Sequence, residues 1–528
     1  MDATRYETLR RAWNEATTPQ RRKSSEVRIG PVTIGGERPV AVQSMTDRNT
    51  NDTEACIEQI GRIRAAGGHI VRLTTQGLRE AASMHTIAAE VRKRWTDTAL
   101  VADIHFVPQV ADAVADTVDK VRINPGNYND RWGGVGAWLD EARRDSTALG
   151  GGVSAGALSP ARVCRDGDRP EGMGESAMGF LRTCRDMNFD QVVISMKSSN
   201  TRVMVHAYRM LTAAMYAEGM EYPLHLGVTE AGNGIEGRIK SAVGIGALLA
   251  DGVGDTIRVS LTEAPENEIP VAKALVNYFS HRSRATYVRT AYTEVCDPFS
   301  YTRRQTIPEG RLGGNNIPLL YSELNSDEMA ALTECRIALL TANGNDPVSE
   351  WRRAITDMQR SGDTRPVILH RRYDTCNTEA LALEAAADFG VMFIDGLADG
   401  IYVEATGVQQ SDADTIALDI LQAARARMSK TEFISCPGCG RTLYALHDTL
   451  AMIKERLSHL RGLKIGVMGC IVNGPGEMAD ADYGYVGAGR NRISLYKGKT
   501  CIEKNIPEEE AVEHLIALIK KEGDWTEP

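Results

Sequence analysis

Short apolar runs recur between about residue 30 and residue 280, and each is followed by a polar turn and a segment of helical periodicity. Most of these runs are nearly continuous in apolar residues, as strands buried on both faces of a parallel sheet are. The strand candidates are residues 40–45, 69–75, 99–103, 120–124, 151–154, 191–196, 224–228 and 256–261. Eight strand–helix units predict a (β/α)8 TIM barrel rather than an open sheet. No GxGxxG follows the first strand, which disfavours a dinucleotide-binding fold.

The segment 53–66 illustrates the helical pattern. Its apolar stripe consists of Cys56, Ile57, Ile60 and Ile63. Asp52 or Thr53 can cap its start, and the glycine pair 67–68 ends it.

The remaining sequence predicts three further regions. Residues 1–29 form an N-terminal extension, and 30–280 form the barrel. Residues 281–430 open with a charged, irregular stretch and continue with apolar segments at 336–340, 366–370, 391–395 and 400–404. Because few polar groups gather at the ends of these segments, we predict an inserted second α/β spacer domain, barrel-like, without catalytic residues. Residues 431–528 predict a small α+β domain that ends in an amphipathic helix over 508–521.

Composition and charge narrow the class of protein. Hydrophobic residues make up 42% and charged residues 25%, both ordinary for a globular protein. The net charge of -9 disfavours nucleic acid as the main partner. The apolar runs are too short and too often broken by charges to span a membrane. The acidic start has no apolar region typical of a signal or transit peptide, so we expect a bacterial cytoplasmic protein. Ten cysteines in a chain of this length do not indicate a disulfide scaffold.

Polar side chains follow the predicted barrel strands, at the end where a barrel of this kind carries its active site. The candidate ligands of a substrate there are Arg72, Arg122, Asn124, Lys197, Lys240, Arg258 and Ser260. So many cations with few carboxylates suit a multiply anionic substrate, since guanidinium groups bind phosphate bidentately and lysine adds a point charge. The alternative is that each charge is a solvated loop residue or one half of an ion pair.

Three residues at the same end are candidates for acid–base chemistry: Asp103, His105 and Glu230. Glu230 lies between glycines just past a strand, in the segment 227–232, which allows its carboxylate to face the barrel mouth. A single histidine near a strand end is more often structural.

Three cysteines and one acid converge in a Gly- and Pro-rich part of the C-terminal region. They are Cys436 and Cys439 in a CxxC pair, Cys470, and Glu477 after the turn at 474–476. Thiolates select zinc, copper(I) or iron–sulfur clusters. A structural zinc ion requires a fourth Cys or His ligand, and Cys501 and His447 are the nearby candidates. The chemistry of the four residues favours a cluster but leaves zinc open.

These segments resemble a known family. Cys436-Pro-Gly-Cys-Gly-Arg441 and Met468-Gly-Cys-Ile-Val-Asn-Gly-Pro-Gly-Glu477 are similar to the iron–sulfur signature of the 4-hydroxy-3-methylbut-2-enyl diphosphate synthases of the methylerythritol phosphate route to isoprenoids. The barrel motifs at 42–46, 102–106, 121–127, 193–197, 224–232 and 240–246 agree. The inserted domain resembles the long, three-domain form. The loop 153–159 departs from the family pattern, which puts one expected substrate contact in doubt, although Arg162 could serve instead.

The resemblance implies the chemistry. Cys436, Cys439 and Cys470 would hold a [4Fe–4S] cluster with Glu477 as its oxygen ligand. The barrel arginines and lysines would bind 2-C-methyl-D-erythritol 2,4-cyclodiphosphate, and Glu230 and Asp103 would be the acid–base groups, with His105 a further candidate. Flavodoxin or ferredoxin would supply electrons. The inserted domain would let the cluster reach the chain's own barrel or, in a homodimer, that of a partner.

Two other classes are compatible with parts of this pattern. A sulfite- or nitrite-reductase-like enzyme shares the C-terminal module but needs sirohaem and four cluster cysteines, whereas this chain has Glu477 at the fourth position. A zinc-stapled scaffold that binds phosphorylated metabolites without turnover needs a zinc ion in place of the cluster.

Overall fold

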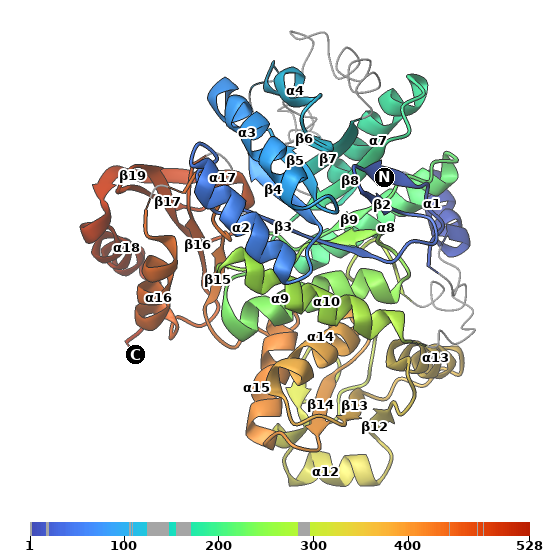
Figure 1. Cartoon of the computed structure of the whole chain (residues 1–528). Coiled ribbons are helices and arrows are strands. Elements are labelled where there is room, and N and C mark those ends of the chain that lie inside the picture. The colour runs from blue at the N-terminus through green and yellow to red at the C-terminus, as the bar shows by residue number, and fades with distance from the viewer. Residues whose placement is uncertain are drawn as a thin grey trace.

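The computed structural model describes residues 3–16, 21–104, 107, 109–123, 147–154, 170–282, 296–442, 444–471, 474–478 and 480–527. Its first large unit is an eight-stranded sheet (Figure 1). The strands are β3 (Ala41–Met45), β4 (Ile70–Thr74), β5 (Ala99–Asp103), β6 (Lys120–Ile123), β7 (Ala148–Ser154), β8 (Val192–Lys197), β9 (His225–Leu226) and β10 (Thr256–Ile257). All eight predicted strands are thus present.

The sheet closes into a parallel barrel. Its order is β8-β7-β6-β5-β4-β3-β10-β9, and a parallel bridge between Ile194 and Leu224 joins the two ends. The predicted TIM barrel is therefore confirmed. Closure places the carboxyl ends of all eight strands around one mouth, which explains why the polar residues that follow them meet.

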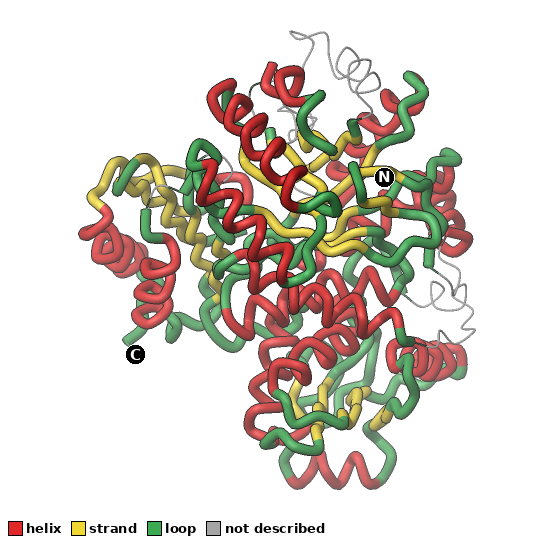
Figure 2. Tube along the Cα trace, viewed as in Figure 1, coloured by secondary structure: helices red, strands yellow, loops and turns green. Residues whose placement is uncertain are grey.

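Helices cover the outside of the barrel (Figure 2). They are α2 (Thr53–Ala65), α3 (Leu78–Arg94), α4 (Gln109–Val114), α7 (Pro170–Asp186), α8 (Thr201–Ala217), α9 (Gly234–Ala250), η4 (Pro265–Asn267) and α10 (Glu268–Ser280). The start of α2 is as predicted, because the Asp52 side chain accepts a hydrogen bond from the Ala55 N–H at 3.2 Å. Gly67, at a φ of +100°, follows its end.

The N-terminal extension covers the opposite end of the barrel from the mouth. Helix α1 (Ala3–Ala16) packs against α8, and the hairpin β1 (Val27–Ile29) and β2 (Val32–Ile34) packs on the barrel floor. Val27, Ile29 and Ile34 are fully buried there against residues from the starts of the barrel strands.

A second, four-stranded parallel sheet has the order β11-β14-β13-β12. Its elements are β11 (Leu319–Leu320), η5 (Tyr321–Glu323), α12 (Ser326–Thr333), β12 (Ala338–Thr341), α13 (Pro347–Arg360), β13 (Val367–Tyr373), α14 (Thr378–Ile394), β14 (Gly400–Ala405) and α15 (Gln410–Ala423). The apolar segment 391–395 is the end of α14 rather than a strand. A continuous apolar run does not identify the secondary structure, because fully buried helices and buried strands both contain such runs.

Helix α14 packs closely on α9 of the barrel (Figure 1). A Cβ atom at Gly246 would lie 2.9 Å from the Cα of Ala387, and one at Gly390 would lie 3.0 Å from the Cα of Val243, so both glycines permit the close approach. The inserted sheet is therefore held firmly against the barrel.

A buried ring of charges reinforces this contact. Arg209 of α8 pairs with Asp251 at 2.8 Å and with Asp395 at 2.6 Å. Arg352 of α13 pairs with the same two carboxylates, at 2.9 and 3.0 Å. Each charge thus has two opposite partners, which offsets the cost of burying it.

The third unit is a mixed five-stranded sheet, in the order β15-β16-β17-β18-β19. Its elements are β15 (Glu432–Ser435), α16 (Leu446–Leu457), β16 (Lys464–Met468), α17 (Gly474–Glu477), β17 (Tyr483–Gly489), β18 (Arg492–Lys497), β19 (Thr500–Pro507) and α18 (Glu508–Glu522). Strand β16 ends two residues before Cys470, and the predicted terminal helix is present as α18. Figure 1 shows this sheet beside the barrel, next to the ends of β3 and α2.

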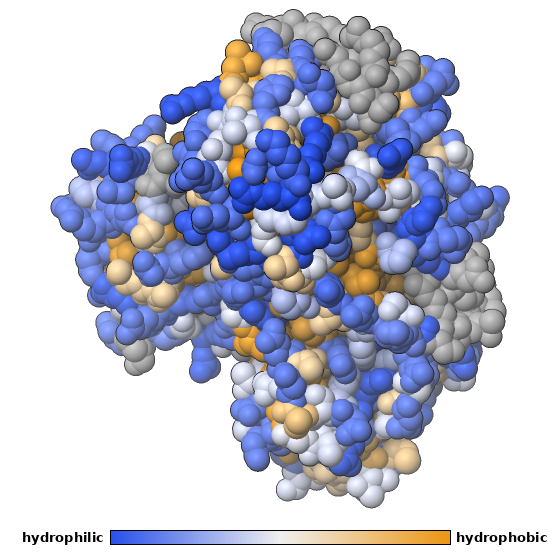
Figure 3. Space-filling model, viewed as in Figure 1, coloured by the Kyte–Doolittle hydropathy of each residue, from blue (hydrophilic) through white to orange (hydrophobic). Residues whose placement is uncertain are grey.

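The face seen in Figure 3 is mostly hydrophilic, with apolar residues scattered among polar ones. Among the helices that the structure describes, none is both long and apolar enough to cross a membrane.

Candidate active site

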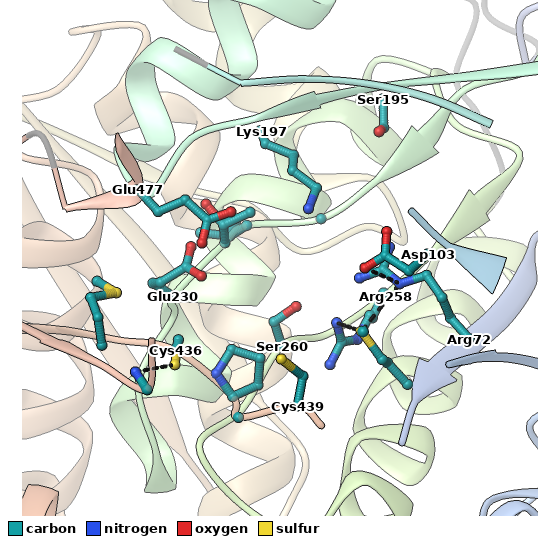
Figure 4. Close-up of a pocket in the computed structure, with 18 of the residues that line it drawn as sticks. Arg72, Asp103, Ser195, Lys197, Glu230, Arg258, Ser260, Cys436, Cys439 and Glu477 are labelled. Atoms are coloured by element: carbon teal, nitrogen blue, oxygen red, sulfur yellow. Dashed lines mark hydrogen bonds and ion pairs between the residues drawn. The ribbon is translucent and has the colours of Figure 1, made fainter. Parts of the chain in front are cut away.

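A cavity of about 80 Å³ lies where the C-terminal sheet meets the mouth of the barrel (Figure 4). Barrel residues within or just after the strands line one side: Arg72, Asp103, Ser195, Lys197, His225, Glu230, Arg258 and Ser260. Loops of the C-terminal sheet line the other: Cys436, Cys439, Arg441, Met468, Cys470 and Glu477. Cations, carboxylates and thiols therefore share one cavity built from two distant parts of the chain.

Asp103, at the end of β5, lies among three guanidinium groups. Arg122 donates to its Oδ1 at 2.8 Å, and Nε of Arg72 and Nη2 of Arg441 lie 3.8 Å from its Oδ2. All four side chains are buried. Gly152 of β7 leaves the space for Arg122, since a Cβ there would be 2.4 Å from its Nη2. In this arrangement Asp103 orients the arginines.

A second carboxylate fixes Arg258. Glu268, at the start of α10, accepts from Nε of Arg258 at 3.1 Å and from Nη2 at 3.0 Å. Ser44 donates to Glu268 at 2.6 Å. This bidentate pair holds the guanidinium of Arg258 at the barrel mouth.

The positive charges act on one another. Burial lowers the pKa of Arg72 to about 10, against the attraction of Asp103 and with help from the charges of Arg258 and Arg122. Burial, followed by Arg122 and Arg72, lowers the pKa of Lys197 to about 7. A bound anion would favour the charged forms of Arg72 and Lys197, so this part of the cavity is suited to an anion.

The carboxyl groups of Glu230 and Glu477 face each other in the cavity (Figure 4). Burial, and then the charge of Glu477, raises the pKa of Glu230 well above its usual value of 4.5. Glu230 has a φ of +52°, a left-handed conformation that is uncommon outside glycine and that the buried turn holds in place. The two acids thus come from different units of the chain but lie side by side in one cavity.

The thiols lie on two loops that follow β15 and β16. Cys436 and Cys439 flank a tight turn in which Gly438 has a φ of +80°. The N–H of Gly469 donates to Sγ of Cys436 at 3.1 Å, and Cys436, Cys439 and Cys470 line the same cavity as Glu477. Among the residues that the structure describes, no group of His, Cys, Asp or Glu converges closely enough to hold a single metal ion.

Contacts across the cavity dock the C-terminal sheet on the barrel of the same chain. Thr262 lies 2.8 Å from Oγ of Ser435 and donates to the carbonyl of Cys436 at 3.0 Å. Ala231 forms a parallel bridge with Ser435, and Ser199 donates to the carbonyl of Glu477 at 3.2 Å. Of the two arrangements that the sequence left open, a single chain therefore adopts the one in which its own C-terminal sheet covers its own barrel.

The structure brings most of the predicted site residues together, with three differences. Lys240, on α9, lies outside this cavity and pairs with Glu432 of β15 at 2.9 Å. Arg122 is not among the residues that line this cavity, although it pairs with Asp103, which is. His105 and Asn124 lie outside the described residues, as does the divergent loop from 155 on with Arg162.

Sequence reasoning assigned no role to Arg441 of the C-terminal loop. Its guanidinium lies beside Asp103, and its pKa is raised because Cys439, Asp103 and Cys470 together outweigh the effect of burial. The signal in the sequence was its position directly after the second cysteine of the CxxC pair and Gly440.

Comparisons with known proteins agree with this architecture. Residues 24–273 match the family model of the GcpE TIM-barrel domain, and residues 432–521 match that of the GcpE protein C-terminal domain. These two matches define the class, a TIM-barrel protein with a GcpE-type C-terminal domain.

Curated relatives named 4-hydroxy-3-methylbut-2-en-1-yl diphosphate synthase (flavodoxin) match along nearly the whole chain. The Phocaeicola vulgatus protein is 45% identical, over 96% of this chain and 99% of its own length. The Chlorobaculum tepidum protein is 37% identical, over 96% and 90%, and the Leptospira interrogans protein is 35% identical, over 96% and 98%. The chain belongs to the GcpE family of 4-hydroxy-3-methylbut-2-en-1-yl diphosphate synthases.

Proposed function

We propose that this chain is an oxidoreductase that converts 2-C-methyl-D-erythritol 2,4-cyclodiphosphate into (E)-4-hydroxy-3-methylbut-2-enyl diphosphate in isoprenoid biosynthesis. The reaction opens the cyclic diphosphate and removes one hydroxyl group as water, and for the neutral acids it consumes two electrons and two protons. The observation that carries the proposal is the cavity itself, in which the cations of the barrel mouth and the thiols of the C-terminal loops face each other. The cations suit a diphosphate substrate, and the thiols suit a redox cofactor that would supply its electrons.

The donor set fits a [4Fe–4S] cluster. Cys436, Cys439 and Cys470 would each bind one iron, and Glu477 would bind the fourth through oxygen. The N–H of Gly469 at Sγ of Cys436 suits a thiolate, because hydrogen bonds to sulfur stabilise its negative charge. When bound, such a cluster supplies electrons singly and offers a Lewis-acidic iron.

The protein's own residues bind and orient the substrate. Arg72, Arg258 and Lys197 supply positive charge from the barrel side of the cavity, and Arg122 adds a further charge through its pair with Asp103. Ser260 and Ser195 add hydroxyl groups. The docked C-terminal loops cover one side of this site, and the burial that results strengthens the charge interactions within it.

Glu230 is suited to hold a proton. Its raised pKa, with burial as the main cause, keeps the carboxyl protonated where an ordinary glutamate is ionised. From this position a proton can pass to the hydroxyl group that leaves as water. Asp103, held by three guanidinium groups, acts instead as their anchor.

The electron donor proposed is flavodoxin. The curated relatives carry flavodoxin in their names, and the sequence left flavodoxin and ferredoxin as alternatives. A homodimer stays a prediction.

The test is anaerobic purification followed by assays for iron, sulfide and zinc, and turnover of the cyclodiphosphate with reduced flavodoxin. We expect about four irons and four sulfides per chain and formation of the linear diphosphate, detected by mass spectrometry. A colourless protein with one tightly bound zinc ion would identify the zinc-stapled scaffold instead. Reduction of sulfite or nitrite, without turnover of the cyclodiphosphate, would identify the reductase-like alternative.

A further inference from the structure

Arg441 crosses from the C-terminal loops to the barrel. It follows Cys439 and Gly440, yet its Nη2 lies 3.8 Å from Oδ2 of Asp103, at the end of β5. Its side chain is only 7% exposed. Among the cavity-lining residues that the structure describes on the C-terminal side, Arg441 is the one cation.

The backbone before Arg441 fits tightly against the barrel. A Cβ atom at Gly440 would lie 2.7 Å from the carbonyl oxygen of Arg48, in the loop after β3. Glycine is therefore required for this approach. Together with the hydrogen bonds of Thr262 to Ser435 and Cys436, it fixes the loop on the barrel mouth. Arg441 reaches Asp103 because the C-terminal sheet is docked.

The resulting charge balance is uneven. Arg72 and Arg122 already face Asp103 from the barrel, and docking adds Arg441, so three guanidinium groups share this carboxylate, although Cys439 and Cys470 also favour the charge of Arg441. Gathering like charges in a buried cavity costs free energy, and a bound anion offsets that cost. Binding and docking are thermodynamically linked. An anion that binds the docked arrangement more tightly than the undocked one favours docking, and docking in turn raises the affinity of the protein for that anion.

We propose that Arg441 is a positioning residue that couples docking of the C-terminal sheet to binding of the substrate's diphosphate. The complete arginine group at Asp103 exists only in the docked arrangement, so the diphosphate stabilises docking and the thiols are brought to the substrate when it is present. This inference rests on the proposed function, since it takes a diphosphate as the anion.

Inorganic pyrophosphate is a suitable probe, because it carries the charge of the substrate and undergoes no reduction. Its affinity for the cluster-loaded protein is measured by titration calorimetry, and docking is measured by hydrogen exchange of the backbone amides in 431–441. We expect pyrophosphate to slow exchange in this segment of the wild-type protein. In Arg441→Gln we expect pyrophosphate to bind about tenfold more weakly, because one charge-assisted contact is lost. We also expect pyrophosphate to slow hydrogen exchange in this segment very little in that variant.

Three variants complete the experiment. Arg441→Lys keeps the charge and should recover part of both effects, which a folding defect would not show. Gly440→Ala keeps Arg441 but obstructs the approach to Arg48, and should weaken pyrophosphate binding and protection together. Arg456→Gln removes a surface arginine of α16 that pairs with Glu513, and should match the wild type. Iron and sulfide content is measured for each variant, to compare proteins with equal loading.

Failure of the inference differs from failure of the proposed function. If the wild type binds pyrophosphate and Arg72→Gln weakens binding, but Arg441→Gln matches the wild type in affinity and protection, the role of Arg441 is wrong and the diphosphate site stands. If the wild type does not bind pyrophosphate, the proposed diphosphate chemistry itself is contradicted.

Discussion

Glu230 and Glu477 point their carboxyl groups at each other, although 247 residues separate them in the sequence and one belongs to the barrel, the other to the C-terminal sheet (Figure 4). The two acids have different proposed roles, since Glu230 transfers a proton and Glu477 binds iron. Their proximity puts the proton next to the site where the hydroxyl group leaves. Substitution should separate the two roles.

We predict that Glu477→Ala retains most of its iron but loses most of its turnover. Three thiols remain to hold a cluster, while the oxygen ligand that ties it to the reaction site is gone. Glu230→Gln should load iron as the wild type does and lose about 100-fold or more in kcat, as expected when a general acid is removed. Iron and sulfide assays beside turnover with a chemical reductant measure both quantities. Wild-type turnover in Glu477→Ala would refute the ligand assignment.

Lys197 and Lys240 make a matched pair for testing the substrate site. Lys197 lines the cavity, whereas Lys240 pairs with Glu432 at the junction of α9 and β15. Lys197→Met should weaken binding of the cyclodiphosphate by roughly tenfold to 100-fold, because a charge-assisted contact contributes roughly 1.5–3 kcal/mol. Lys240→Met should bind it almost as well as the wild type. Calorimetric titration with the cyclodiphosphate measures the affinity of both variants. A larger loss of affinity in Lys240→Met than in Lys197→Met would support the substrate-binding role that the sequence predicted for Lys240.

The comparison of these two lysines shows what sequence patterns can and cannot locate. In a TIM barrel the carboxyl ends of all strands lie at the mouth. The apolar runs that predict the strands therefore also predicted that Arg72, Asp103 and Arg258 lie at the mouth, where they line the cavity. Lys240 lies on a helix, and the direction of its side chain depends on how α9 packs against the other two sheets. Local periodicity does not carry that information.

Long-range docking limited the predictions in the same way. The contact of Arg441 with Asp103 joins segments that no local pattern relates, so only its place after the CxxC pair drew attention. The run 391–395 was ambiguous for a different reason. Helix α14 is buried on nearly all sides between α9 and the inserted sheet, so its sequence lacks the polar face that identifies a surface helix.

Glu268 should prove important for stability through Arg258. Its carboxylate is 1% exposed and accepts from two guanidinium nitrogens. Glu268→Gln leaves a buried guanidinium without its counter-charge, which should lower the free energy of unfolding by about 3 kcal/mol or more. Glu266→Gln is the control, because the pair that Glu266 makes with Arg62 is partly exposed and should contribute less than about 1 kcal/mol. Urea unfolding measures the free energy of unfolding of both variants. Equal losses of stability in the two would contradict the role of Glu268 as the counter-charge of Arg258.

His206 should make stability depend on pH. It lies on α8 with 3% of its surface exposed, and its Nε2 has no hydrogen-bond partner among the residues that the structure describes. Burial, and then the neighbouring charge of Arg209, lowers its pKa from 6.5 to about 4, against the weaker attraction of Asp395 and Asp297 and with a small contribution from Arg202. Between pH 6.5 and pH 4 the unfolded chain therefore binds a proton at this position that the folded chain does not.

Stability contributed by a neutral His206 is consequently full above pH 6.5 and decreases as the pH falls towards 4. The lowered pKa corresponds to a loss on the order of 3 kcal/mol across that window. A His206→Gln variant cannot take up the proton, so its urea midpoint should fall less steeply from about pH 7 to about pH 5 than that of the wild type. Carboxylates elsewhere titrate alike in both proteins, and their effect cancels in the difference. Two parallel pH curves would mean that His206 has the same pKa in the folded and in the unfolded protein.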